Sequence, residues 1–402
     1  MRQLNSAFLG WVSRHWRGII SATCLVVLVL AIMGFNLNGV VDGQNIYESH
    51  TLKYLESAPR PWYTPVNAPF LLPAYLVGKL IGNMLLGARV ISFAYCLLSA
   101  LCIFLLAKMW FNVRIATVVL LLFASSSWLL ILSHSATFYS LLVASPLLLL
   151  TSLAWFFRTK KHRFISFLVF SIFLAFSLYV PYMFWVALFV MAVLIFKERK
   201  KLLLLKRWQI ILPATVFLIL LTPLFYATMH YPGLIKMLIG VPIEWPSIPQ
   251  YFINLFSLYG GLFLQSKPLP ELTLGKLPLL DIFSSAMLVL GIYYFISRWP
   301  NRRSVLILCC LAFLPLILAL DTHFQMYLAL LIPFIYLTVI VGFIELINQW
   351  VAYFPRNPLA KNIGIALVVL SISMISFYHL QRFYVAWPNS PQTKSVYVVK
   401  SR

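Results

Sequence analysis

Long apolar segments alternate with short polar segments along most of the chain. The first apolar segment covers residues 19–35, and most of the later ones are of similar length. A helix needs about 20 apolar residues to cross the hydrocarbon core of a bilayer. The apolar residues follow one another without the two-residue alternation of barrel strands, so the pattern predicts helices. We predict an all-α polytopic membrane protein with about 11 transmembrane helices.

The predicted helices follow from the limits of the apolar segments. They cover residues 19–35, 88–111, 115–132, 140–157, two short helices of a shallow hairpin within 164–196, then 208–229, 277–296, 305–320, 328–347 and 363–378. No convincing internal repeat accompanies them, which argues against the inverted repeats of many transporters. We therefore expect one transmembrane domain over residues 1–402.

Three longer polar segments separate or follow these helices. They are a first outer loop at 36–87, a second at 230–275 and an external C-terminal tail at 379–402. Five prolines between Pro59 and Pro73 exclude one long helix in the first loop. Two short interfacial helices, over 44–56 and 69–86, fit its pattern.

Composition and charge support a membrane protein. The chain is 62% hydrophobic and 10% charged, whereas soluble domains are about 25% charged. The net charge of +22 comes from basic residues in short clusters such as 158–163 and 197–201. Such clusters mark cytoplasmic loops. We expect 20 of the 31 Lys and Arg residues on the cytoplasmic side, a cytoplasmic N-terminus, an external C-terminus and no nucleic-acid partner.

Acidic residues are scarce, which draws attention to the few that occur. Only nine are present, and Asp42, Glu48 and Glu56 lie in the first outer loop. Asp42 directly follows the first helix, where a carboxylate could accept a proton from an acceptor hydroxyl. A solvated loop acid or a helix cap is the alternative interpretation. Glu48 is the second candidate, and Glu56 has the pattern of a surface residue.

Other polar residues are expected on the same outer face. Asp321 and His323 follow the helix at 305–320, and His134 and Tyr139 lie in the turn after 115–132. Each of these residues alone could be structural, but their common depth at the outer face of the membrane favours a functional site. We find no row of ionisable residues across the bilayer, which argues against a pump or channel.

Basic residues of the outer segments could bind a phosphate, although anchoring to lipid headgroups is the alternative. They include Arg60, Arg89 and Lys267. The sequence has no glycine-rich phosphate loop, so a nucleotide substrate is unsupported. The five cysteines all lie in apolar segments without metal-ligand spacing, which is typical of small core residues.

Several blocks resemble the GT-C type membrane glycosyltransferases, among them the aminoarabinose transferases and protein O-mannosyltransferases. Asp42 matches the first acid of their loop motif, although Gly43 follows it here. Residues 67–101, 133–139 and 323–333 resemble three further blocks in the same order. In the last of these, Met326 precedes Tyr327 where the family usually has arginine.

The resemblance implies a multi-pass enzyme of the plasma or inner membrane that acts in cell-envelope glycan biosynthesis. A sugar would move from a polyprenyl-phosphate donor to a lipid, glycan or protein acceptor at the outer face. Asp42 would be the base, with Glu48 as the second catalytic candidate. The expected substrate-binding residues are His50, Lys53, Arg60, Arg89, His134, Tyr139, Lys267, Asp321, His323 and Tyr327.

Two other interpretations remain open at this stage, and so does one property of the proposed enzyme. The protein could be a transporter or lipid flippase. It could also be a diverged, non-catalytic membrane relative, an interpretation that Gly43 and Met326 favour. No metal-ligand set is identified, and the resemblance leaves a divalent metal open.

Overall fold

A computed structural model of the chain describes residues 20–37, 40–41, 43–57, 59–60, 62–242, 244–266, 269–321 and 324–397. Its regular elements are helices. In chain order they are Ile20–Gly34, α2 (Ile46–Glu56), α3 (Ala68–Ile81), α4 (Met84–Trp110), α5 (Val113–Ser125), α6 (Ser127–His134), α7 (Tyr139–Arg158), α8 (Arg163–Ser177), α9 (Met183–Leu203), α10 (Arg207–His230), α11 (Gly233–Ile239), α12 (Ile248–Phe263), α13 (Ile282–Ser297), α14 (Arg302–Leu318), α15 (Phe324–Tyr327), η1 (Leu328–Leu331), α16 (Ile332–Tyr353), α17 (Pro358–Gln381), η2 (Arg382–Ala386), α18 (Trp387–Asn389) and α19 (Pro391–Val396).

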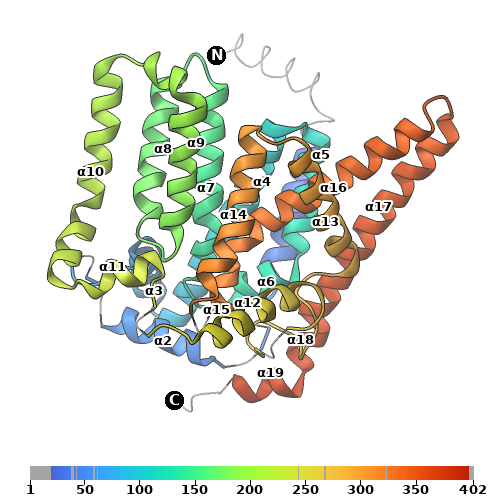
Figure 1. Cartoon of the computed structure of the whole chain (residues 1–402). Helices are drawn as coiled ribbons and strands as arrows, with labels where there is room; N and C mark the ends of the chain where they lie inside the picture. The colour runs from blue at the N-terminus through green and yellow to red at the C-terminus, as the bar shows by residue number, and fades with distance from the viewer. Residues whose placement is uncertain are drawn as a thin grey trace, which may run out of the picture.

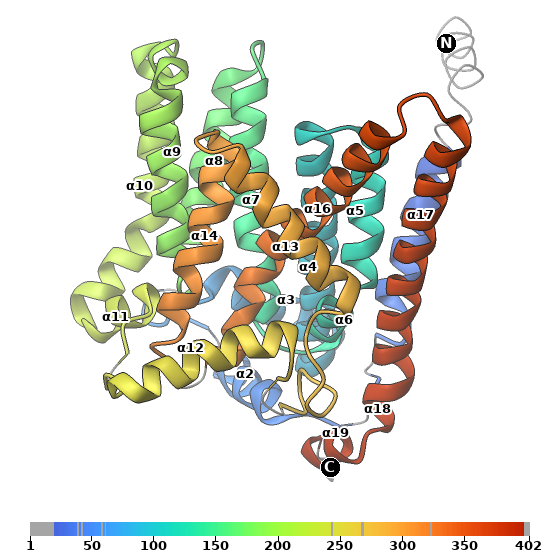
Figure 2. The ribbon, with the colours of Figure 1, turned by 45° about the vertical axis from the view of Figure 1, so that its right-hand side comes forward.

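The helices form a bundle with a clear centre and periphery. Within their most apolar windows, α7 is 72% buried and the span Gln325–Tyr353 is 78% buried. The corresponding figure is 22% for α10 and for the span Pro358–Asn389, which includes α17. Figures 1 and 2 show α10 and α17 at opposite sides of the bundle. Because both are apolar and largely uncovered by protein, they are suited to contact with lipid.

The prediction of an all-α polytopic membrane protein is confirmed. Among the described residues, five helices are long and apolar enough to cross a membrane, or six if the bent pair α5–α6 counts as one span. Five further apolar helices have 10–17 residues, such as Ile20–Gly34 and Ile282–Ser297. The total of about 11 spans therefore stays a prediction.

Short helices gather at one end of the bundle, where α2, α3, α12, α15, α18 and α19 lie together (Figure 1). Two of them, α2 and α3, form in the first loop near the expected ranges. Asn45 caps α2 by accepting from the Glu48 backbone N–H. Two features bound α3: a proline in its first turn and Gly82 in the left-handed conformation after its end.

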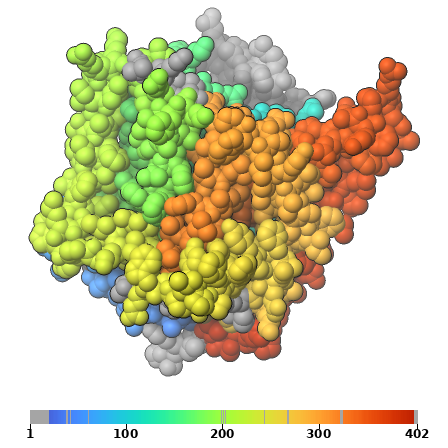
Figure 3. Space-filling view, in the orientation of Figure 1, coloured from blue at the N-terminus to red at the C-terminus, as the bar shows by residue number. Residues whose placement is uncertain are grey.

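The segment 230–275 is more regular than the predicted loop. It contains α11 and α12, and α12 lies across the ends of the long helices (Figures 2 and 3). The buried residues of α12 are Asn254, Leu258, Gly261 and Leu262. Their spacing of four, three and one residues places them on one helical face. The aromatic residues Tyr251, Phe252, Phe256 and Tyr259 therefore belong to an amphipathic helix.

Two other segments differ in detail from the helix limits expected from the sequence. The single helix expected at 115–132 is the pair α5–α6, bent by 59° at Ser126. The segment 379–402 begins inside α17 and continues as η2, α18 and α19. Hydrogen bonds from Tyr384 Oη to the Ile32 carbonyl and from Trp387 Nε1 to the Pro270 carbonyl hold this C-terminal segment against the body.

The helices α13 and α16 pack closely because two glycines face each other's backbone. A Cβ atom on Gly291 would collide with the carbonyl oxygen of Thr338, and one on Gly342 with the carbonyl oxygen of Met287. Small residues at a crossing of membrane helices allow such an approach.

We predict that Gly291→Ala and Gly342→Ala each destabilise the protein by about 1–3 kcal/mol, because the added methyl group forces two backbones apart. The measurement is the thermal unfolding midpoint of detergent-solubilised protein. Gly260→Ala in α12 is the control, since a Cβ there meets no atom within 4 Å. Equal midpoints for all three variants would contradict the packing argument.

Candidate functional site

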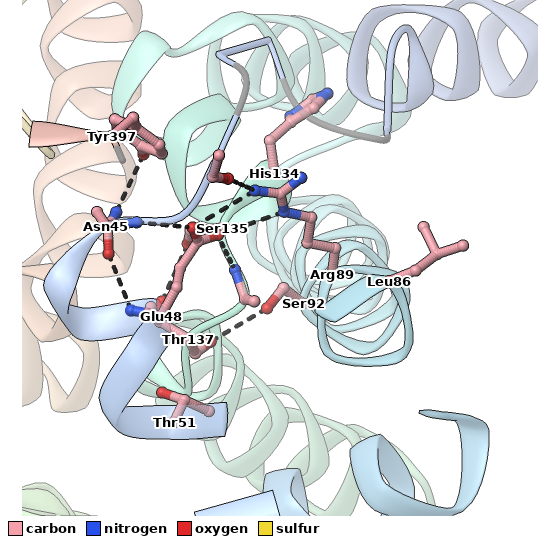
Figure 4. A network of polar contacts seen from close by, with 12 residues as sticks. Asn45, Glu48, Thr51, Leu86, Arg89, Ser92, His134, Ser135, Thr137 and Tyr397 are labelled. Carbon is pink, nitrogen blue, oxygen red and sulfur yellow. Dashed lines mark hydrogen bonds and ion pairs between the residues drawn. The ribbon is translucent and has the colours of Figure 1, made fainter. Parts of the chain in front are cut away.

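A buried ion pair joins the first outer loop to α4. Glu48, in the first turn of α2, is 0% exposed, and Arg89 of α4 is 4% exposed. Arg89 Nε lies 3.3 Å from Glu48 Oε1, and Arg89 Nη2 lies 3.4 Å from Oε2. Figure 4 shows the two side chains facing each other. The charge of each group is thus offset by the other inside the protein.

Backbone N–H groups complete the surroundings of the Glu48 carboxylate. The Ala136 N–H donates to Oε1 at 2.7 Å, and the Asn45 N–H donates to Oε2 at 3.2 Å (Figure 4). Ala136 belongs to the turn between α6 and α7. Glu48 therefore connects three segments of the chain, and both of its oxygens already accept hydrogen bonds.

The backbone carbonyls of Phe35 and Gly43, which come before and after Asp42 in the sequence, are each bound by a side chain. Arg89 Nη2 donates to the Gly43 carbonyl oxygen at 3.1 Å, directly after Asp42. His134 Nε2 lies 2.9 Å from the Phe35 carbonyl oxygen, before the segment. In the tautomer protonated at Nε2, His134 donates to that carbonyl. Two predicted site residues, Arg89 and His134, thus bind the backbone that flanks a third.

A cleft of about 490 Å³ opens beside this segment. Its lining comes from the first loop and from the C-terminal helices: Phe35, Asn36, Val40, Val41, Tyr384, Pro388, Asn389 and Lys394. The rings of Phe35 and Tyr384 meet edge to face with centroids 5.6 Å apart. Lys394 is exposed and adds a positive charge to the cleft.

Four tyrosines form a second cluster next to the ion pair. Ring centroids are 6.1 Å apart for Tyr47 and Tyr139, 5.9 Å for Tyr139 and Tyr327, and 4.8 Å for Tyr327 and Tyr182. Tyr182 Oη donates to Asp321 Oδ2 at 2.8 Å. Burial, followed by the charge of Asp321, raises the pKa of Tyr182, so its hydroxyl stays protonated and available as a donor.

Two residues of this region carry no signal in the sequence. Tyr397, near the C-terminus, accepts a hydrogen bond from Asn45 Nδ2 at 3.0 Å (Figure 4). Burial, followed by the charge of Glu48, raises the pKa of Tyr397. Tyr397 and Asn45 are 352 positions apart, and no local pattern could have paired them. Lys394 was likewise not predicted.

The remaining predicted site residues divide into two groups. His50 and Lys53 are exposed on α2, and Arg60 is exposed at a separate cleft of about 240 Å³. The structure does not bring these three into the network around Glu48. Asp42, Lys267 and His323 lie outside the described residues. In the described part of the chain, no group of three His, Cys, Asp or Glu side chains converges as a metal site would require.

Comparisons with known proteins identify the fold. No family model and no curated protein matches the sequence. Among solved structures, ArnT from Cupriavidus metallidurans in the apo state is similar over 95% of this chain and 78% of its own, with a TM-score of 0.58 and 14% identity.

The oligosaccharyltransferase of Archaeoglobus fulgidus, tethered to an acceptor peptide, also has a TM-score of 0.58 and 14% identity. The match covers 97% of this chain but 57% of the oligosaccharyltransferase. The oligosaccharyltransferase AglB from the same organism, in complex with an inhibitory peptide and a dolichol-phosphate, has a TM-score of 0.54. Both enzymes are GT-C type membrane glycosyltransferases, and this chain has their fold.

We predict that Glu48→Gln lowers the stability of the protein by about 3–5 kcal/mol, because Arg89 keeps its charge in a buried place without a carboxylate. Glu56→Gln, an exposed position on the same helix, should change the unfolding midpoint little. The double variant Glu48→Gln/Arg89→Gln should lose less than the sum of the two single variants. Additive losses would show that the pair does not act as a unit.

Proposed function

We propose that this protein is a glycosyltransferase that moves a sugar from a polyprenyl-phosphate donor to an acceptor at the membrane surface where α2, α3 and α12 lie. The fold that it shares with two transferases supports this proposal. The complex of AglB with a dolichol-phosphate and a peptide supports a lipid-phosphate donor. The acceptor class, whether lipid, glycan or protein, is left open by the proposal.

The observation that supports the proposal most strongly is the pair of contacts at the two ends of the segment between Phe35 and Gly43. Its flanking carbonyls are bound by His134 and Arg89, and Val40 and Val41 line the cleft. A loop fixed on both sides can hold a reacting group within the narrow range that catalysis requires. Asp42 is the acid of this segment, and we assign the role of general base to it.

The proposed reaction is a single displacement at the anomeric carbon. The carboxylate of Asp42 takes the proton from the acceptor hydroxyl, whose oxygen then bonds to the anomeric carbon. The bond from that carbon to the phosphate oxygen breaks, and its electron pair leaves with the polyprenyl phosphate. The configuration of the sugar inverts. In this reaction Lys394 offsets the negative charge that grows on the leaving phosphate.

Glu48 takes a positioning role in this proposal. Its two oxygens already accept hydrogen bonds from Arg89, Asn45 and Ala136. The carboxylate therefore has no free lone pair with which to take a proton from an acceptor hydroxyl. Through Arg89 it fixes the carbonyl of Gly43. We propose that the sugar contacts the tyrosine cluster, through Tyr139, Asp321 and Tyr327. Tyrosine rings can pack against the apolar face of a sugar, and tyrosine hydroxyls can form hydrogen bonds with its hydroxyl groups.

We predict that Asp42→Asn reduces the rate of sugar transfer by about 10²–10⁴-fold, the usual contribution of a general base. The substitution keeps the side-chain shape, so the unfolding midpoint should stay close to that of the wild type. Membranes containing the protein would be supplied with radiolabelled polyprenyl-phosphate sugars, and label in the acceptor fraction would be counted.

Glu56→Gln serves as the matched control because it removes an exposed acid from the same loop. Equal transfer by the wild type and Asp42→Asn would remove Asp42 from the reaction. A loss in Asp42→Asn together with a large fall in stability would instead make this acid structural.

A further inference from the structure

A second large cleft lies at the other end of the bundle. Its volume is about 450 Å³. The cleft is lined by Met109, Trp110, Leu150, Leu153, Ala154, Phe157, Arg158, Val193, Arg302, Arg303 and Leu306. We refer to these residues as the arginine pocket. The pocket lies where α4 and α7 end and where α14 begins.

The arginine pocket is separate from the candidate active site. The first residue of α7, Tyr139, belongs to the tyrosine cluster, and the last residue, Arg158, lines the pocket. A helix rises 1.5 Å per residue, so the length of α7 separates the two places by about 30 Å. A ligand in the arginine pocket therefore does not touch the region of Glu48.

Two of the arginines are held in place by the end of α4. Arg158 Nη1 donates to the Met109 carbonyl at 2.9 Å, and Arg303 Nη1 donates to the Trp110 carbonyl at 2.8 Å. Carbonyls in the last turn of a helix lack a partner within the helix, so these bonds complete its C-terminus. A guanidinium has five N–H groups. After one such bond, each arginine retains donors for an anion.

The positive charges in the pocket act on one another. Burial, and then the charges of Arg302 and Arg158, lower the pKa of Arg303. The Arg303 guanidinium also lies over the Trp110 ring, with its Cζ 5.5 Å from the ring centroid. Among the described residues that line the pocket, none is acidic. A bound anion would offset the repulsion between these guanidinium groups.

The other side of the pocket is apolar. Leu150, Leu153, Ala154 and Phe157 recur along α7 at the spacing of one helical face. Leu150 lies eight residues before Arg158, which corresponds to about 12 Å along the helix axis toward the centre of the bundle. The pocket thus combines a positively charged rim with an apolar wall that extends inward.

We propose that the arginine pocket binds the phosphate group of an anionic lipid, with the first part of an acyl chain along the wall formed by α7. Arg158 and Arg303 provide paired N–H donors for phosphate oxygens, the geometry in which guanidinium groups bind phosphate most strongly. Basic pockets between membrane helices recognise lipid headgroups in this manner. The site is independent of the proposed transferase reaction.

The test is a binding titration with purified, detergent-solubilised full-length protein. The probe is fluorescent phosphatidylglycerol, with fluorescent phosphatidylcholine as the zwitterionic comparison. We predict that Arg158→Gln/Arg303→Gln weakens the binding of phosphatidylglycerol at least tenfold. Arg298→Gln is the matched control because Arg298 is exposed, lies close in sequence and does not line the pocket. It should bind as the wild type does.

Each outcome decides the proposal. A lipid site is supported if the protein binds phosphatidylglycerol selectively, if this binding depends on the arginine pair, and if excess glycerol phosphate does not displace the lipid. Displacement by glycerol phosphate at similar concentration would show a site for soluble phosphate esters and overturn the lipid assignment. An equal loss in Arg298→Gln, or equal affinity for phosphatidylcholine, would overturn the site itself. Matching unfolding midpoints confirm that the variants are folded.

Discussion

The buried pair of Glu48 and Arg89 is the interaction on which the polar end of this molecule depends. Two charges taken out of water are costly unless each finds its partner and further hydrogen bonds. Here the carboxylate also accepts from Asn45 and Ala136, and the guanidinium also donates to Gly43. The cost of burial is offset only when α2, α4 and the turn before α7 meet in this one arrangement.

This arrangement explains how an apolar bundle carries an ordered polar surface. The long helices pack through apolar contacts and close glycine crossings, which do not fix the loops between them. The loops are fixed by directional bonds: His134 to Phe35, Arg89 to Gly43, and Asn45 to Tyr397. The last of these brings the C-terminal segment beside the first loop, and the cleft lined by Val40, Val41 and Tyr384 forms between those two segments.

Much of the architecture could be predicted because a helix surrounded by lipid requires a continuous apolar segment, and such segments are visible in the sequence. The scarcity of acids was enough to select Glu48, and the basic residue Arg89 was selected as a phosphate ligand. Their pairing was not predicted, because a contact across 41 positions leaves no periodic trace. The helix α12 was missed because its aromatic and glycine residues are also typical of ordered loops.

The bend at Ser126 shows the same limit, since neither glycine nor proline marks it in the sequence. Tyr397 and Lys394 were missed for another reason: the tail that carries them has no apolar segment to signal that it folds back. Tertiary packing decides such features, and the sequence pattern alone reports only which segments are apolar and which charges are rare.

We propose that the lipid-phosphate donor of the transfer reaction binds in the cleft between the first loop and the C-terminal helices. The most direct measurement is photocrosslinking with a polyprenyl phosphate that carries a diazirine on the carbon chain near the phosphate, followed by peptide mass spectrometry. We expect crosslinks in the segments 35–41 and 384–394, and their loss when excess unlabelled donor is added. Crosslinks confined to the ends of α4 and α7 around Arg158, or none that the donor displaces, would contradict it.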